Sequence, residues 1–304
     1  MHRRDFLKHL AALGLAVGVG RYLPLPEAVW AMSPEARPEP LVARVQGADY
    51  AKLVMDAVQA LGGMQKFVKP GEVVVIKPNI GWDRAPELGA NTHPLVVRKT
   101  VEMCLEAGAK KVTVLDRTCD NPQRSYVNSG IKAAVEAIGD KRAATAYMDE
   151  RRFVKLAIQK ARLLKEWYFY QDILEADRFI NIPVAKVHSE AVLTQALKNM
   201  MGAIGGWRAR IHVGIHQNIA DMNLVLRPDL NILDATRIMV KNGPKGGSPS
   251  DVVVKNLVFA SADPVALDAV GTGLFGLTPE DVGHIRLAHE AGRGEMDLKK
   301  IKVV

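Results

Sequence analysis

Short apolar runs alternate with amphipathic segments along most of the chain. Glu72–Lys77 and Lys111–Leu115 are compact apolar runs, typical of strands that are buried on both faces of a sheet. Between them, Pro94–Gly108 carries apolar residues at helical spacing. A strand, a helix and a second strand in this order predict two parallel strands joined by a right-handed crossover.

The same alternation continues to the end of the sequence. Further strands are expected at Phe153–Ile158, Arg178–Ile182, Asn231–Leu233 and Asn256–Ala260. Further helices are expected at Asp49–Leu61, Arg124–Ile138, Ala191–Met201, Ile219–Leu226, Asp263–Phe275 and Pro279–Glu290. The sequence therefore predicts an α/β fold with a mostly parallel, doubly wound sheet and helices on both faces.

The first residues follow a different pattern. Arg3 and Arg4 are followed by Phe-Leu-Lys, by a short apolar run over Leu10–Val19 and by small residues at 29–31. This order resembles a twin-arginine (Tat) export signal; an amphipathic helix with two incidental arginines is the alternative. The resemblance implies export by the Tat translocase to the periplasm or another extracytoplasmic compartment. The apolar run is too short for a permanent membrane anchor.

This interpretation divides the chain into three parts. Residues 1–31 are expected to be a signal peptide, the proline-rich residues 32–45 a linker, and residues 46–304 a single α/β domain.

Composition excludes several classes of protein. The chain has 304 residues, of which 48% are hydrophobic and 24% charged, as in an ordinary soluble protein. The formal net charge of +8 is spread along the chain without a dense basic stripe, so nucleic acid is not an expected partner. Two cysteines cannot supply a four-cysteine iron–sulfur cluster, and none is expected.

Polar side chains follow the predicted strands at the points where the strands end. Because parallel strands end at the same edge of a sheet, and ligands bind beyond that edge, these groups are expected to converge on one crevice. They are Lys77, Asn79, Thr92, His93, Asp116, Arg117, Lys186, His188, Asp234, Ser261 and Asp263.

Several of these residues also have a purely structural interpretation. Asp263 and Thr92 each precede a proline-initiated helix and are candidate N-caps. Asn79 follows a proline and suits a turn, and Asp116 could pair with the adjacent arginine. Lys198 falls on a predicted helix, where solvent exposure is the usual state of lysine.

Two kinds of ligand remain open. His212 and His216 lie on one side of their segment whether it is a strand or a helix, and imidazoles with nearby carboxylates can bind one divalent transition metal. The metal hypothesis uses His188, His212, His216, Asp116 and Asp234. The rival is a small phosphate or carboxylate, bound by the cationic side chains of Lys77, Lys186, Lys198 and Arg117.

Motifs distributed over residues 41–295 resemble the domain of unknown function 362 family. They include Ile76–Asn79, Thr92–Pro94, Lys186 with His188, Ala196–Gly202, Asn242–Pro244 and Ser261–Asp268. The resemblance implies a single α/β domain without a settled activity. Some relatives have an attached iron–sulfur segment whose cysteines this chain lacks. Thr92–Leu115 is also similar to the N-terminal domain of nickel-dependent lactate racemases.

Together these observations predict an exported soluble protein, an enzyme with a metal or small-anion site at the carboxyl ends of the strands. A non-catalytic periplasmic protein that binds a ligand or metal is the alternative. The expected catalytic residues are Lys186, His188, Lys198 and Asn199. The expected ligand-binding residues are Lys77, Asn79, Thr92, His93, Arg117 and Asp263.

Overall fold

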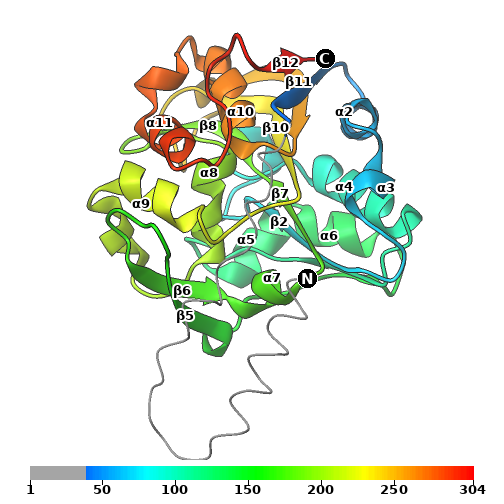
Figure 1. Ribbon diagram of the computed structural model, residues 1–304. Helices are drawn as coiled ribbons and strands as arrows, with labels where there is room; N and C mark the ends of the chain where they lie inside the picture. The colour runs from blue at the N-terminus through cyan, green and yellow to red at the C-terminus, as the bar shows by residue number, and fades with distance from the viewer. Residues whose placement is uncertain (1–38) are drawn as a thin grey trace, which may run out of the picture.

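The computed structural model describes residues 39–304 (Figure 1). The expected signal peptide, residues 1–31, lies outside the described residues. Leu41–Gln46 form strand β1, so the prediction of a linker that continues to residue 45 was wrong. The folded part of the chain therefore begins before residue 46.

A ten-stranded, mostly parallel sheet forms the centre of the molecule. β11 is antiparallel to β10 and to β1, and β8 branches from β10. The order along the sheet is β12 (Lys302–Val303), β1, β11 (Val252–Ser261), β10 (Leu230–Met239), β7 (Arg178–Ile182), β2 (Val73–Pro78), β3 (Lys111–Val114) and β4 (Ala143–Thr145). Off this path, β8 (Val184–His188) pairs with β10, and β9 (Val192–Thr194) pairs with β8. A separate hairpin consists of β5 (Phe153–Ala157) and β6 (Glu166–Tyr170).

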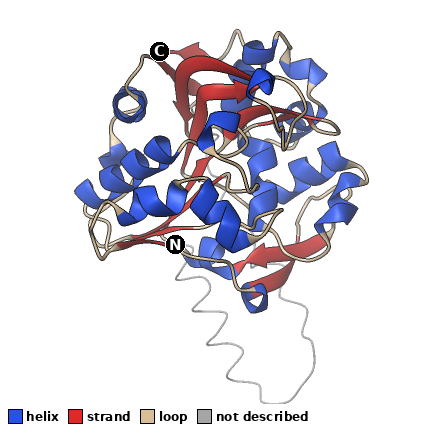
Figure 2. Cartoon of the chain, turned by 180° about the vertical axis from the view of Figure 1, so that it is seen from behind, coloured by secondary structure: helices blue, strands red, loops and turns tan. Residues whose placement is uncertain are grey.

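Helices cover both faces of the sheet (Figures 1 and 2). One face carries α2 (Tyr50–Ala60), α3 (Met64–Phe67), α4 (Pro94–Glu106), α5 (Pro122–Asn128) and α6 (Ile131–Glu136). The other carries α7 (Gln171–Glu175), α8 (Ala196–Asn199), α9 (Ile215–Met222), α10 (Pro264–Gly271) and α11 (Gly283–Glu290). The predicted α/β architecture is therefore present.

Strand β2 shows why the sheet has two cores. Val74 and Ile76 pack with α2 and α4, whereas the alternate residue Val75 packs on the opposite face. Since successive side chains of a strand point to opposite faces, a strand covered on both sides has to be apolar throughout. Lys77, at its carboxyl end, is the exception and is fully buried.

Several expected helices have different boundaries in the structure. The one expected at Ile219–Leu226 lies four residues earlier, as α9, and the one expected at Pro279–Glu290 is a 3-10 turn (Pro279–Asp281) followed by α11. The segment from Arg124 to Ile138 is interrupted at Gly130, whose φ of 73° is left-handed and ends α5 before α6 begins. The segment from Ala191 to Met201 begins as strand β9, which pairs with β8, before the short helix α8. Strand pairing therefore prevails over the helical pattern there.

Within residues 39–304, none of the helices is both long enough and apolar enough to span a bilayer.

Candidate functional site

A cavity of about 620 Å³ lies beyond the carboxyl ends of β2, β3 and β8. Helix α8 and the 3-10 helix Arg208–His212 complete its wall. The structure brings many of the predicted site residues together here: Lys77, Asn79, Asp116, Arg117, Lys186, His188, Lys198, Asn199 and His212.

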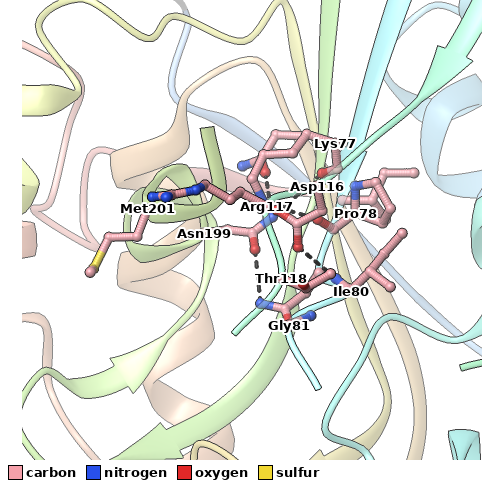
Figure 3. A network of polar contacts seen from close by, with 12 residues as sticks. Lys77, Pro78, Ile80, Gly81, Asp116, Arg117, Thr118, Asn199 and Met201 are labelled. Carbon is pink, nitrogen blue, oxygen red and sulfur yellow. Dashed lines mark hydrogen bonds and ion pairs between the residues drawn. The ribbon is translucent and has the colours of Figure 1, made fainter. Parts of the chain in front are cut away.

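Lys77 and Asp116 form a buried ion pair at the floor of the cavity (Figure 3). Nζ of Lys77 lies 2.8 Å from Oδ1 of Asp116, and Oδ2 accepts a hydrogen bond of 2.7 Å from the amide of Ile80. Burial lowers the pKa of Lys77 and raises the pKa of Asp116, and the attraction between the two charges opposes both shifts. The positive charge of Lys77 and the negative charge of Asp116 offset each other, so the pair as a whole is neutral.

Gly202 packs directly against this ion pair. A Cβ atom at this position would overlap Oδ1 of Asp116 and lie 2.7 Å from Nζ of Lys77. The pair can approach the backbone so closely only because residue 202 has no side chain.

Lys186 is held by neutral oxygen atoms. Its Nζ donates to the carbonyl of Ala90 at 2.5 Å and to Oδ1 of Asn79 at 3.3 Å. Burial, together with the neighbouring charge of Lys198, lowers its pKa to about 7. Its amine can therefore gain or lose a proton near neutral pH.

Lys198 is the cavity's exception among buried cations. It is 8% exposed, and no hydrogen bond or ion pair joins its Nζ to any described residue. Burial lowers its pKa to about 8. The helix that carries it is held in place by Asp268, whose carboxylate accepts hydrogen bonds from the amides of Ala196 (2.7 Å) and Leu197 (2.9 Å). A fixed backbone therefore carries a cation that lacks a partner.

His188 is a neutral donor. Its Nδ1 accepts hydrogen bonds from the amides of Glu190 (3.1 Å) and Ala191 (3.2 Å), so its hydrogen resides on Nε2. Burial, together with the charge of Lys198, lowers its pKa to about 3. The ring stacks on His212 at 6.1 Å, and Nδ1 of His212 lies 2.6 Å from a carboxylate oxygen of Glu190.

A chain of asparagine side chains runs from the cavity into the sheet. Asn79 donates to Asn199 (2.9 Å), Asn199 to Asn181 (2.8 Å) and Asn181 to Asn231 (2.9 Å). Asn181 and Asn231 are cross-strand neighbours in β7 and β10. These bonds fix the amide of Asn199 and orient Oδ1 of Asn79 toward Lys186.

The two arginines at the cavity have structural partners. Arg117 forms a two-pronged ion pair with Glu150, at 2.9 and 3.1 Å. Arg208 donates to the carbonyls of Arg117 (2.9 Å) and Thr118 (2.6 Å). Arg208 thus has backbone oxygens but no carboxylate among its described partners.

Three residues of the site were not predicted from the sequence: Arg208, Gly202 and Asn181. An asparagine within the apolar strand Phe179–Ile182 was a visible signal, because asparagine is rare in buried strands. Nothing in the local sequence distinguishes Arg208 from the neighbouring Arg210.

Three expected ligand-binding residues do not line the cavity. The hydroxyl of Thr92 donates to the carbonyl of Ile182 (2.7 Å) and supports the Asn79 backbone, while His93 is the N-cap of α4. Asp263 caps α10, as its structural interpretation predicted. β11 runs antiparallel to β10, so Ser261 at the end of β11 pairs with Asn231 near the start of β10. Asp263, which follows β11, therefore lies at the opposite edge from the one where the parallel strands end.

The structure does not bring the five residues of the metal hypothesis together. These residues have other partners: Nδ1 of His216 lies 3.2 Å from Nδ1 of His284, and Asp234 accepts from the amide of His93 (2.7 Å) and the hydroxyl of Thr236 (2.7 Å). Asp116 is paired with Lys77, and Nδ1 of His188 accepts hydrogen bonds from the backbone amides of Glu190 and Ala191. Among residues 39–304, no three His, Cys, Asp or Glu side chains are grouped so that they could hold an ion.

The geometry defines an α/β protein with a cationic cavity at the carboxyl edge of its sheet. Residues 74–273 match the family described as "Domain of unknown function (DUF362)", and the chain belongs to that family.

Individual relatives are more distant. The "Thylakoid-associated protein sll1697" of Synechocystis sp. is 28% identical over 237 residues, which cover 74% of this chain and 70% of that protein. A Thermotoga maritima crystal structure covers 81% of this chain and 60% of its own, at 13% identity and a TM-score of 0.44. The similarity to the lactate racemase apoprotein of Thermoanaerobacterium thermosaccharolyticum covers 83% of this chain and 58% of that protein, at 12% identity and a TM-score of 0.43. The chain spans less than two thirds of either solved protein.

Proposed function

We propose that the protein is an enzyme that binds a small anionic organic molecule in the cavity at the carboxyl edge of the sheet. The observation that carries the proposal is Lys198, a cavity-lining residue that is 8% exposed and whose ammonium has no hydrogen-bonding or ionic partner among the described residues. A buried charge without a partner is strongly unfavourable, so the position favours an anionic ligand that would neutralise it.

The charge balance of the cavity supports an anion. Asp116 neutralises Lys77, and Glu150 neutralises Arg117. Lys186, Lys198 and Arg208 have no carboxylate partner in the described part of the chain. Three cationic side chains therefore remain available to a carboxylate or phosphate.

The protonation states support catalysis. The pKa of Lys186 is lowered to about 7 and that of Lys198 to about 8, so either amine can exchange a proton near neutral pH. In this proposal they act as acid and base, Nε2–H of His188 donates to the bound molecule, and Asn199 and Asn79 orient the polar groups around it.

Ligand-induced stabilisation tests the proposal. Phosphate, citrate, pyruvate, lactate and glyoxylate are added singly to the wild-type protein and to Lys198→Met, and the thermal midpoint is measured. At least one anion should raise the midpoint of the wild type and raise that of the variant much less. Lys132→Met is the matched control, because Lys132 is a half-exposed lysine on α6 that does not line the cavity.

Three outcomes decide between the hypotheses. Stabilisation by no anion, or equal stabilisation of wild type and Lys198→Met, would reject the anion site. A bound anion that is recovered unaltered by NMR after long incubation would favour the non-catalytic binding protein. Chemical conversion of the anion that requires Lys186 or Lys198 would favour the enzyme.

We also propose that the protein is exported through the Tat route to the periplasm or an equivalent compartment. The proposal depends on the order of Arg3-Arg4, the apolar run and the small residues at 29–31.

A further inference from the structure

We propose that Lys198 forms an imine with its ligand, so that the ligand is an anion with a reactive carbonyl group, a 2-oxo acid or an anionic aldehyde. This inference rests on the proposed anion site and specifies the class of molecule that the site binds.

The partners of the three cavity lysines single out Lys198. Nζ of Lys77 is paired with Asp116 at 2.8 Å, and Nζ of Lys186 is committed to the carbonyl of Ala90 at 2.5 Å. Nζ of Lys198 makes neither kind of contact with the described residues, and Lys198 is a largely buried residue that lines a cavity large enough for an organic molecule. Among these lysines it is therefore the one that can approach a ligand atom without first breaking a bond.

The backbone under Lys198 is fixed, as a nucleophile requires. Asp268 accepts from the amides of Ala196 and Leu197, and Nδ2 of Asn223 donates to the carbonyl of Leu197 at 3.0 Å. Both Asp268 and Asn223 are buried. A ligand carbonyl would thus meet an amine whose position is set by the core of the protein.

The environment of Lys198 also favours the unprotonated, nucleophilic form of its amine. Burial lowers the pKa of Lys198 to about 8, so at neutral pH it holds roughly two- to three-hundredfold more free base than an ordinary lysine. Desolvation is a recognised way of activating a lysine that attacks carbonyl groups.

The reaction balances without a further reactant. The nitrogen lone pair attacks the carbonyl carbon, both hydrogens of the amine pass to the carbonyl oxygen, and that oxygen leaves as water. A carbon–nitrogen double bond replaces the carbon–oxygen double bond, and nothing is oxidised or reduced. Lys186 and Arg208 remain to hold the anionic group, and Nε2–H of His188 remains as a donor for the carbonyl oxygen.

Reductive trapping tests the imine. The full-length protein is incubated with glyoxylate and cyanoborohydride near neutral pH, digested, and analysed by mass spectrometry. We expect a carboxymethyl group on Lys198 to form far faster than on Lys132, which serves as the internal control in the same digest. Lys198→Arg keeps the positive charge but lacks the nucleophilic amine, so it should lose this adduct and still be stabilised by glyoxylate.

Glycolate, which has a hydroxyl group in place of the carbonyl, separates this inference from the proposed function. If glyoxylate and glycolate both stabilise the protein but no preferential Lys198 adduct forms, the imine is rejected and the anion site stands. If neither stabilises and no adduct forms, both proposals fail. Labelling that is equal at Lys198 and Lys132 would likewise reject the imine.

Discussion

At the residue scale, the buried lysines of the cavity differ in what offsets their charge. Lys77 has the carboxylate of Asp116, whereas Lys186 has only neutral oxygens. Lys198 has no such contact with a described residue. Because an anion stabilises the ammonium form of a lysine, the protonation of Lys186 and Lys198 should be coupled to ligand binding.

The first prediction is a pH dependence of anion affinity. The pKa values of Lys186 and Lys198 are lowered to about 7 and about 8, so their positive charges disappear as the pH rises through that range. Affinity for a ligand of constant charge should therefore fall between about pH 7 and about pH 9, and the complex should take up protons in this range. Calorimetric titrations in buffers of different ionisation enthalpy measure both effects. An affinity that is constant over this range would contradict the prediction.

The second prediction concerns the contact between Gly202 and the ion pair. Gly202→Ala should push Lys77 and Asp116 apart and lower the free energy of unfolding by about 3 kcal/mol, because both charges are buried. Denaturant titration measures the loss. Gly273→Ala is the control, since a Cβ there meets no atom within 4 Å. Equal stability of the two variants would show that the contact at Gly202 is unimportant.

The residue scale also limits what the sequence can predict. The apolar run before Lys77 indicated a strand end, and a polar group there was expected from that position alone. The identity of its partner was not accessible: Asp116 pairs with Lys77, 39 positions away, and not with the adjacent Arg117. Side-chain pairing depends on which strands become neighbours, and local sequence does not contain that information.

At the scale of elements, two buried aspartates cap two helices in the same way. Asp268 accepts from the first amides of α8, which carries Lys198, and Asp263 accepts from the amides of Val265 and Ala266 in α10. Both carboxylates satisfy backbone donors that would otherwise be buried without a partner. They differ in their distance from the cavity: Asp268 contacts α8 directly, whereas Asp263 caps α10, which contributes no residue to the cavity lining and supports it only through Asp268.

This difference gives the third prediction. Asp263→Ala and Asp268→Ala should each lower the free energy of unfolding by about 3 kcal/mol, because each orphans at least two buried donors. Asp268→Ala should weaken anion binding much more than Asp263→Ala, since it directly releases the backbone that positions Lys198, whereas Asp263 acts on that backbone only through α10. Stability and affinity are measured well below the unfolding temperature of both variants. Equal weakening of binding by both would contradict the assignment.

The strand-end rule explains which elements the sequence placed correctly. It worked for β2 and β3, whose ends deliver Lys77 and Asp116 to one cavity. Lys186 and His188 also reach this cavity, but they lie in β8, a strand that the sequence did not predict, and not in a loop after β7. The rule failed at β11, because that strand is antiparallel to β10. It also failed at Asp234, because β10 continues to Met239, well past the apolar residues that suggested its end. Strand direction and strand length are set by pairing, which the apolar pattern does not reveal.

At the scale of the whole molecule, contacts between distant segments complete the fold. β1 lies between β11 and β12, and the amide of Val304 donates to the carbonyl of Val42 at 3.0 Å. Likewise His216 of α9 contacts His284 of α11. Because of this long-range contact, the structure does not assemble the metal site that the spacing of His212 and His216 suggested. The first strand cannot take its place in the sheet until the last strands have been synthesised.

This topology bears on the last prediction, which concerns export. Because β1 pairs with β11 and β12, the sheet is complete only after these strands have been synthesised. Folding before transport is compatible with an export route that carries folded proteins. If the protein follows the proposed Tat route, replacing both Arg3 and Arg4 with lysine should abolish export and leave the folded protein in the cytoplasm of a Tat-competent bacterium. Arg21→Lys, a similar change in the same segment outside the motif, should leave export intact. Cell fractionation with protease protection measures the distribution. Export of the twin-lysine variant at the wild-type level would mean that the arginine pair is incidental and that the N-terminal segment has another role.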